Sequence, residues 1–572
     1  MKRLTLSLLI FILVFFILGV PFIDWGFSTV DDFPVFFHSQ AKNLKDLFFG
    51  DISAWDVLAP CNYVIPKGNS FSSAYYRPMM FISYYAGSIF WGSSAYCHFL
   101  FTIFLHALNA VLLFNLFTSI SSYLLAFLAT MFFAFNPSYA CWMGWIAAQQ
   151  YPMGLFFLLI SIVFFKQYLD KRNYIYFILS GLSYLLTILG KEVCMVFPAI
   201  AFIGTYLYET KCLHVKVSGM FNILIRYLKL TFNYWVIALL YLTLRACVFP
   251  LNFGSSGVGT LPSFGLIYFL RSKIYYLFVI LTDLFGLWWV PWGYPRLKAL
   301  IYLFIFSIFI WLFIKSSQKL VLVFCLFSTT LFWWPIALGY FSRYLYESIP
   351  FVCLFFLFGV KFYKGKVSLK IKEILLFFIS CFILLNASYL LINIKFREQS
   401  NFIINKAFDE LVASVELKNR NLCFIGVPSK FSPGCERAIW VKSGDYSNLI
   451  LHDLDLVSCI SGDLPNLQKA LGLKVKHYFD ANEFLDKNYI SIEKIKNGFR
   501  FISLDSDKLW FIKRNLAGNY LPIGQAIING VEQDDKICDV SLIIDSNWLN
   551  KRPVFITWDY LSQKFKVLGE VE

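Results

Sequence analysis

The sequence predicts a polytopic α-helical membrane protein that ends in a mixed α/β domain. Of its 572 residues, 58% are hydrophobic and 20% aromatic, which is more apolar surface than a soluble chain of this length could bury. Up to about residue 396, apolar runs of about 18 residues or more recur, each long enough to cross about 30 Å of hydrocarbon. Beyond that point the runs are short and are separated by Gly, Asn, Asp and Pro, as in a folded α/β domain.

Eleven of the apolar runs are predicted to be transmembrane helices. The first follows Lys2 and Arg3 without a convincing small-residue cleavage site, so we expect a retained helix rather than a cleaved signal peptide. A further run between residues 250 and 296 is interrupted by charged residues and is expected to lie on or dip into the outer face as an interfacial helix. The eleven helices are expected at about 4–22, 95–118, 122–136, 152–168, 173–189, 194–209, 232–249, 297–314, 319–338, 346–362 and 373–394.

The distribution of charge orients these helices. The excess of positive charge, +15 for the whole chain, lies in residues 1–396, because acidic and basic residues nearly cancel in the tail. Five short basic clusters lie between apolar runs, which favours orientation by the positive-inside rule over nucleic-acid binding. With these clusters in the cytoplasm, the first residues lie inside and the tail lies outside. The clusters are Lys2/Arg3, Lys166 to Arg172, Lys211 to Lys229, Lys315 to Lys319 and Lys361 to Lys372.

This topology implies two domains. Residues 1–396 form the membrane domain, in which residues 24–94 are a first extracytoplasmic loop that carries an acidic pair and an interfacial helix. Residues 397–572 form a soluble extracytoplasmic α/β domain, which at about 175 residues is long enough to bury its own core. We expect a multi-pass protein of the bacterial inner (cell) membrane, with its functional site facing the periplasm or exterior.

The acidic residues of the membrane domain avoid the centres of the predicted helices. Six of them fall in the first loop, among them the adjacent Asp31 and Asp32 in STVDDFPVFF. An ion-coupled transporter would be expected to place ionisable groups near the membrane midplane. The pattern therefore favours a site at the outer mouth of the bundle, although a solvated loop or a helix N-cap also explains the acidic pair.

Several cations share the predicted mouth. Arg77 lies in YYRPMMF, Lys191 precedes Glu192 in LGKEVCMVFP, and Arg343 lies in SRYLYESIP. Arg offers a bidentate fork to phosphate oxygens and Lys adds a point charge, so Arg77, Lys191 and Arg343 are predicted to bind a lipid phosphate. Interfacial anchoring also explains either Arg, and a helix-end ion pair also explains Lys191 with Glu192.

Two histidines follow the first loop on one predicted helix. His98 and His106 are eight residues apart, about two helical turns. His106 is predicted to be a packing histidine, and His98 is kept as a donor-binding candidate.

Short motifs follow one another along the chain in the order VDD, YRPM, H-x7-HALNA, FNP, GKE and RYLYE. In that order they resemble the GT-C membrane glycosyltransferases, most closely the O-mannosyltransferases that carry tetratricopeptide repeats, and more loosely the protein mannosyltransferases and aminoarabinose transferases. The resemblance covers about residues 20–350. It implies an inverting transferase that takes a sugar from a polyprenyl-phosphate donor on the outer leaflet, with the catalytic carboxylate at Asp31 or Asp32. Of the two we favour Asp32, with the other acid tuning its pKa or binding a metal. Further site candidates are Glu192, His98, Tyr344 and Tyr346.

The sequence departs from these families in two places. Asn136 and Cys141 in FNPSYAC replace a His and a Glu, so a second acidic contribution to the site stays open. The tail shows no tetratricopeptide pattern, so acceptor handling is not carried over from the resemblance.

The predicted reaction needs no cofactor. A carboxylate accepts the proton of an acceptor hydroxyl, and the lipid phosphate leaves as a stable anion. No Cys or His spacing indicates a metal site, while a divalent cation held by the acidic pair stays open. The predicted partners are the donor lipid, an acceptor protein, lipid or glycan, and membrane lipids, without nucleic acid. Three alternatives stay open: a transporter or flippase of lipid-linked saccharides, a polymerase or ligase of surface polysaccharide, and a non-catalytic scaffold that displays the tail.

Overall fold

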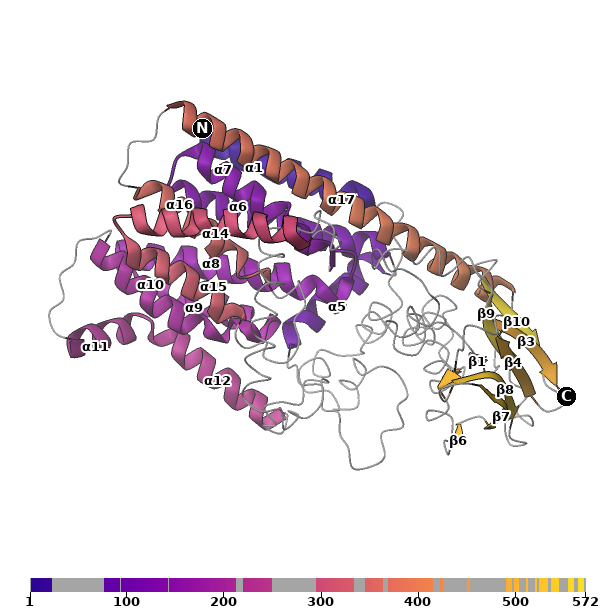
Figure 1. Cartoon of the computed structure of the whole chain (residues 1–572). Helices are drawn as coiled ribbons and strands as arrows, with labels where there is room; N and C mark the ends of the chain where they lie inside the picture. The colour runs from indigo at the N-terminus through magenta and orange to yellow at the C-terminus, as the bar shows by residue number, and fades with distance from the viewer. Residues whose placement is uncertain are drawn as a thin grey trace. The chain divides into compact units, whose positions relative to one another are not determined.

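The structure, a computed structural model, describes most of the helical part of the chain and the strands of its tail (Figure 1). The described residues are 2–22, 77–248, 295–414 and ten strands beyond them, with gaps at 93, 142, 212–219, 334–344 and 364–368. Asp31, Asp32, Arg343 and Tyr344 lie outside the described residues, as does nearly all of the run between 250 and 296. The described residues divide into two compact units, of which the first ends at Arg397 and the second begins at Glu398.

The first unit is a bundle of helices (Figure 1). Its α-helices are α1 (Lys2–Gly19), α5 (Pro78–Trp91), α6 (Ala95–Thr118), α7 (Tyr123–Ala134), α8 (Gln150–Lys171), α9 (Tyr174–Gly190), α10 (Phe197–Lys211), α11 (Met220–Leu230), α12 (Phe232–Val248), α14 (Pro295–Lys315), α15 (Lys319–Trp333), α16 (Ile349–Lys361) and α17 (Leu369–Ser414). Short 3₁₀ helices stand between some of them: η1 (Val20–Phe22), η3 (Pro137–Cys141), η4 (Ile146–Gln149) and η5 (Glu192–Val196). Because α17 runs past Arg397, its last residues belong to the second unit.

Within the described residues, five helical segments are long and apolar enough to cross a membrane. They are Lys2–Gly19, Ala95–Thr118, Gln150–Lys171, Glu192–Thr210 and Leu376–Lys395. A bent pair made of α11 and α12 would be a sixth, and the remaining apolar helices are shorter. The described part of the first unit is therefore a helical fold of the kind that spans membranes. Each of the eleven predicted segments contains a described helix, while the number of crossings stays a prediction.

Two of the differences from the predicted helix bounds affect the site or the tail. The helix expected at 346–362 begins at Ile349, and Pro350 lies in its first turn, where a helix does not need the N–H that proline lacks. Tyr346 and Glu347 therefore lie in a turn before α16. The helix expected at 373–394 continues to Ser414, because helix formers follow the apolar run without a Gly or Pro to end it.

The turn between α8 and α9 brings two distant parts of the sequence to one end of the bundle. α8 ends at Lys171 and is followed by Arg172, whose φ of 54° is left-handed, as is common where a helix stops. Asn173 then caps α9, because its side chain accepts a hydrogen bond of 2.9 Å from the backbone N–H of Ile175. With so short a turn, α8 and α9 are antiparallel neighbours. The first residue of α8, Gln150, therefore lies at the same end of the bundle as the last residue of α9, Gly190.

The second unit contains the end of α17 and two sheets. The smaller sheet has the order β10-β9-β1-β2, in which β1 is parallel to β2 and β9, and β10 is antiparallel to β9. The larger sheet is antiparallel and has the order β3-β4-β8-β7-β6, with β5 beside β8. The strands are β1 (Leu422–Phe424), β2 (Ile450–His452), β3 (Ile490–Ile495), β4 (Gly498–Ser503), β5 (Phe511–Ile512), β6 (Tyr520–Leu521), β7 (Gly524–Glu532), β8 (Lys536–Ile544), β9 (Val554–Asp559) and β10 (Lys564–Gly569).

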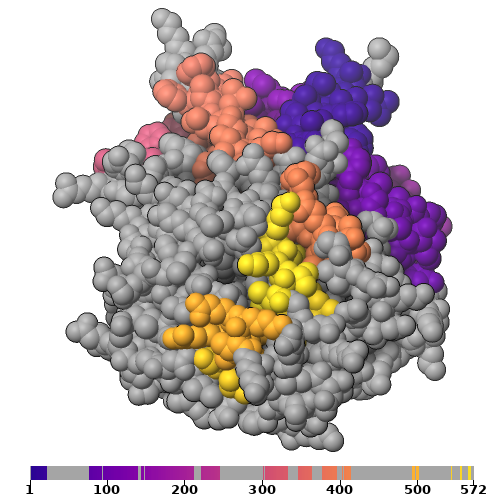
Figure 2. All heavy atoms as spheres, turned by 90° about the vertical axis from the view of Figure 1, so that its right-hand side faces the viewer, coloured from indigo at the N-terminus to yellow at the C-terminus, as the bar shows by residue number. Residues whose placement is uncertain are grey.

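The end of α17 packs on the last strand of the smaller sheet. The rings of Phe408 and Phe565 lie 4.7 Å apart, and Lys564 forms an ion pair of 2.8 Å with Glu410. Figure 2 shows the yellow residues near the end of the chain beside the orange end of this helix. A contact between Phe499 and Phe555, with ring centroids 5.2 Å apart, joins a strand of the larger sheet to one of the smaller.

Candidate functional site

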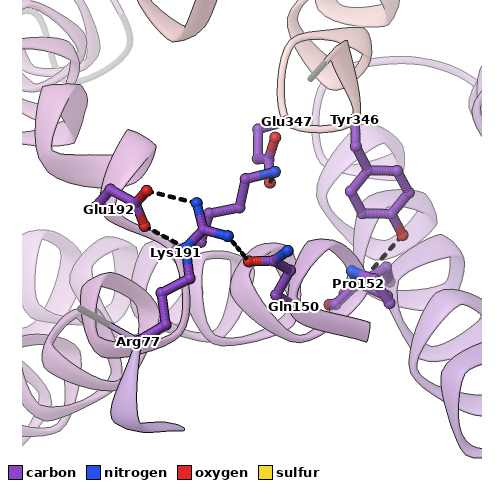
Figure 3. Close-up of polar contacts among 8 residues, drawn as sticks. Arg77, Gln150, Pro152, Lys191, Glu192, Tyr346 and Glu347 are labelled. Carbon is purple, nitrogen blue, oxygen red and sulfur yellow. Dashed lines mark hydrogen bonds and ion pairs between the residues drawn. The ribbon is translucent and has the colours of Figure 1, made fainter. Parts of the chain in front are cut away.

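Charged and polar side chains from segments far apart in the sequence meet at one end of the helical bundle (Figure 3). We call this set the ion cluster; its members are Arg77, Gln150, Tyr151, Lys191, Glu192 and Glu347. Every member lies at the end of a helix or in the turn beside it. Helix ends leave backbone N–H and C=O groups without intrahelical partners, so they are places where a bundle accommodates polar side chains.

Arg77 precedes Pro78, the first residue of α5. Its guanidinium forms a bidentate pair with the Glu192 carboxylate: Nε donates to Oε2 and Nη2 donates to Oε1, both at 2.5 Å. Nη1 donates to Oε1 of Gln150 at the start of α8. The Arg77 and Glu192 side chains are only 10% and 15% exposed. Arg77 thus holds three segments together with the bidentate geometry that it would use on a phosphate.

Lys191 is the most deeply buried cation of the ion cluster. Its Nζ lies 2.8 Å from Oε1 of Glu347 and 3.2 Å from the centre of the Tyr151 ring, and both charged side chains are almost fully buried. The side chain crosses α8 at Gly154, where an added Cβ would come within 3.2 Å of the Lys191 Cβ. A glycine at this position therefore gives the lysine its path to Glu347.

Burial and pairing shift the pKa values of Lys191 and Glu347 in opposite directions. Burial lowers the pKa of Lys191 and raises the pKa of Glu347, because each charge loses its water, while the opposite charge beside it works in the other direction. Replacing either partner of such a pair by a neutral residue typically costs about 3–5 kcal/mol, because the remaining charge is left buried and unpaired. The four charged side chains of the ion cluster balance, two positive and two negative.

A second polar group supports the turn that carries Glu347. The Tyr346 hydroxyl lies 2.7 Å from Nδ1 of His106, and Nδ2 of Asn109 donates to it at 3.1 Å. Nε2 of His106 lies 3.0 Å from the carbonyl oxygen of Ala134. A carbonyl only accepts, so Nε2 carries the proton, and in the neutral ring Nδ1 accepts from the Tyr346 hydroxyl. Because Asn109 also donates to the carbonyl of Pro152, at 2.7 Å, α6 ties the Glu347 turn to α8.

The structure brings together four of the residues predicted for the site. Arg77, Lys191 and Glu192 belong to the ion cluster, and Tyr346 directly precedes Glu347. Lys191 and Glu192 do not pair with each other, as the helix-end alternative supposed, but with partners on other segments. The acidic pair, Arg343 and Tyr344 lie outside the described residues.

His98 is buried at the junction of α5 and α6. Its Nε2 lies 3.3 Å from the carbonyl oxygen of Gly92, and its ring meets that of Trp91 edge-on at 5.5 Å. Trp91 ends α5 and Arg77 precedes it, so His98 packs beside the opposite end of a 14-residue helix, about 21 Å from Arg77 along its axis. His106, predicted to be a packing residue, is the histidine that contacts Tyr346.

Sequence reasoning did not single out Glu347, Gln150 or Tyr151 as site residues. Glu347 is the last residue of the RYLYE motif, so the motif itself was a usable signal. Gln150 and Tyr151 lie in an AAQQYP stretch that carries no local signal for their roles. Their partners are 73 and 40 positions away in the chain, Arg77 and Lys191 respectively.

In the part of the chain that the structure describes, no group of three or more His, Cys, Asp or Glu side chains is placed to hold a metal ion.

Among the solved structures that resemble this chain are two forms of ArnT. ArnT from Cupriavidus metallidurans bound to undecaprenyl phosphate is 12% identical, with a TM-score of 0.41 over 78% of this chain and 89% of that one. The apo form of ArnT from the same organism is 10% identical, with a TM-score of 0.42 over 95% of this chain and 98% of that one. Both TM-scores lie below 0.5. No protein-family model and no curated protein matches the chain.

Proposed function

We propose that this chain is a membrane glycosyltransferase of the GT-C type. It takes a sugar from a polyprenyl-phosphate donor and transfers it, with inversion, to an acceptor hydroxyl on the outer face of a bacterial inner membrane. The observation that carries the proposal is the ion cluster. Arg77 and Lys191, named from the sequence as phosphate ligands, lie at one end of an apolar helical bundle although they are 114 positions apart in the chain.

The proposed reaction is a single displacement. The acceptor oxygen attacks the anomeric carbon of the sugar, and the bond from that carbon to the phosphate oxygen breaks on the opposite face. The electron pair of the broken bond stays on the lipid phosphate, and the proton of the acceptor hydroxyl goes to a carboxylate, Asp32 in preference to Asp31. The phosphate leaves as a stable anion, so no general acid is needed.

The cations stabilise the charge that develops on the leaving phosphate. In the proposal Arg77, Lys191 and Arg343 supply this positive charge. Because Arg77 is paired with Glu192 and Lys191 with Glu347, the donor phosphate has to exchange places with a carboxylate or bind beside it. The carboxylates keep the cations in position while the site holds no donor, which limits the cost of gathering like charges.

The proposal is tested by following the fate of the donor lipid. Purified protein in lipid nanodiscs is given a polyprenyl-phosphate sugar and an acceptor, and release of the free polyprenyl phosphate is measured by mass spectrometry. Surface glycans of cells with and without the intact protein are compared as well. A transferase releases the lipid phosphate and changes a glycan. A flippase would move the donor across the bilayer and leave its sugar–phosphate bond intact, and that result would overturn the proposal.

A further inference from the structure

Helix α11 exposes an apolar stripe that no other helix covers among the described residues. Phe221, Leu224 and Leu228 are 71%, 47% and 38% exposed, and their spacing of three and four residues puts them on one face of the helix. Asn222 and Lys229, seven residues apart, form a separate exposed polar face. Around the helix, Asn222 and Leu224 point about 160° apart.

The third face of α11 fastens it to the bundle. Tyr227 is fully buried, and its ring packs edge-on against Tyr206 and Phe202 of α10, at 5.5 and 6.2 Å between centroids. Arg226 donates from Nε and Nη2 to the Glu209 carboxylate, at 2.8 and 3.2 Å. α11 is therefore a fixed part of the first unit rather than a loose segment, and its apolar stripe is held outward.

Basic residues lie on this helix and at the end of α8, to which Glu209 links it. Glu209 is fully buried and also receives Nη2 of Arg172, at 2.5 Å, so one carboxylate holds two guanidinium groups that are 45% and 40% exposed. Lys171 and Lys229 are exposed nearby, and Lys166 pairs with Asp170 at 2.8 Å. We call this set the basic rim: Lys166, Lys171, Arg172, Arg226 and Lys229. Against its five positive charges stand the two acids Asp170 and Glu209, which leaves a net positive charge.

The basic rim lies at the end of the bundle opposite the ion cluster. α8 begins at Gln150, in the ion cluster, and ends at Lys171, in the basic rim. Its 22 residues span about 33 Å, close to the thickness of the hydrocarbon core of a bilayer. The segment Glu192–Thr210 also runs from the ion cluster to the basic rim: Glu192 lies in the ion cluster, and Glu209 binds Arg172 and Arg226 of the basic rim. α11 then meets α12 at an angle of 68°, as a helix does when it leaves a transmembrane direction for the membrane plane.

We infer that α11 lies in the headgroup layer of the leaflet opposite the ion cluster, and that the basic rim binds anionic phospholipid there. The apolar stripe enters the acyl region, Asn222 of the polar face meets the aqueous side, and the basic rim, including Lys229, contacts the phosphates. This is the arrangement of an interfacial amphipathic helix. A second copy of the chain is a poorer occupant, because symmetric contact at this surface would bring two basic rims together. The inference requires only that the helices span a membrane, and it is independent of the proposed activity.

The depth of α11 is tested with a photoreactive benzophenone amino acid. It is placed at position 224, in the apolar stripe, or at position 222, on the polar face, in the full chain reconstituted in nanodiscs of phosphatidylcholine with phosphatidylglycerol. Both native side chains are exposed, so each position has room for the larger side chain. After illumination, acyl-chain adducts should form at 224 and be several-fold rarer at 222. Equal labelling at both positions, no lipid adduct at 224, or cross-linking to a second chain would each overturn the inference.

The preference for anionic lipid is tested with charge-neutral variants. The double variant Lys171→Gln/Lys229→Gln removes two cations of the basic rim that do not pair with Glu209. The ion pair of Arg226 with Glu209, which attaches α11 to α10, is therefore kept. Retention of phosphatidylglycerol, measured by native mass spectrometry, should weaken by about tenfold to thirtyfold. The matched control is Lys494→Gln/Lys566→Gln, which removes two exposed cations on β3 and β10 of the second unit. Equal retention by the two double variants would contradict an anionic lipid site at the basic rim.

Discussion

At the scale of single residues, the ion cluster is built from pairs rather than from isolated charges. Arg77 has a carboxylate and an amide as partners, and Lys191 lies between the Glu347 carboxylate and the face of the Tyr151 ring. A paired charged side chain contributes separately to the stability of the fold and to donor binding. Substitutions at Lys191 and Glu347 test the first contribution, and substitutions at Arg77 test the second.

The Lys191–Glu347 pair should show strong coupling. Lys191→Met and Glu347→Gln should each lower the free energy of unfolding by about 3–5 kcal/mol, because each leaves a buried charge without its partner. The double variant leaves no such charge, so it should lose much less than the sum of the single losses. Detergent-micelle unfolding of the four proteins gives the coupling energy. A double variant that loses the full sum would mean that the two side chains do not pair in the folded protein.

Arg77 should contribute to donor binding directly, and not only through its ion pair with Glu192. A charged hydrogen bond is worth about 1.5–3 kcal/mol, so Arg77→Ala should weaken donor binding by about tenfold to a hundredfold. Arg77→Lys should rescue only part of the loss, because the fork is gone. Glu192→Gln is the matched control, since it breaks the same pair and keeps the guanidinium. If this control weakens donor binding as much as Arg77→Ala, the pair alone accounts for the effect.

At the scale of elements, the ends of helices place the site. Arg77 stands before α5, Gln150 begins α8, Lys191 follows α9, and Glu347 stands before α16. The antiparallel turn at Arg172 puts the starts and ends of α8 and α9 in register, so one end of this pair carries the ion cluster and the other carries the basic rim. Small shifts between these helices should therefore change the distances between the side chains of the ion cluster.

Gly154 tests this dependence on helix packing. The Cβ of Gly154→Ala would come within 3.2 Å of the Lys191 Cβ, closer than ordinary van der Waals contact, so the lysine should be displaced from Glu347. We expect sugar transfer to fall several-fold even though alanine favours the helix by about 1 kcal/mol. Gly190→Ala is the control, because its Cβ would meet Met153 at an ordinary 3.4 Å. Equal activity of the two variants would show that the path of Lys191 does not depend on Gly154.

At the scale of the whole molecule, the apolar pattern predicted where the helices lie and much less of how they meet. The length and hydropathy of an apolar run are enough to predict the position of a helix such as α6, which covers its predicted range of 95–118. The short α11 was predicted only as part of a basic cluster, because an 11-residue helix is too short to register as an apolar run. The pairing of Lys191 with Glu347 joins segments more than 150 positions apart, and no local period encodes such a contact.

The topology predicted for the whole chain rests on its basic clusters. We expect eleven crossings with the second unit outside, because this places every cluster in the cytoplasm. A reporter that is active only in the cytoplasm, fused behind residue 572, should be silent, and the same reporter inserted after residue 171 should be active. A signal from the first fusion would contradict the topology.

The most direct test of the account is single-turnover transfer by variants of the acidic pair. Purified Asp31→Asn, Asp32→Asn and the double variant are mixed with a polyprenyl-phosphate sugar and an acceptor, and the rate of sugar transfer is compared with that of the unchanged chain. A missing general base typically costs about a hundredfold to ten-thousandfold in rate, so one single variant, expected to be Asp32→Asn, and the double variant should lose transfer while they still bind donor. Transfer at the normal rate by the folded double variant would contradict the account, because the carboxylate on which the proposed reaction depends would then play no part in it.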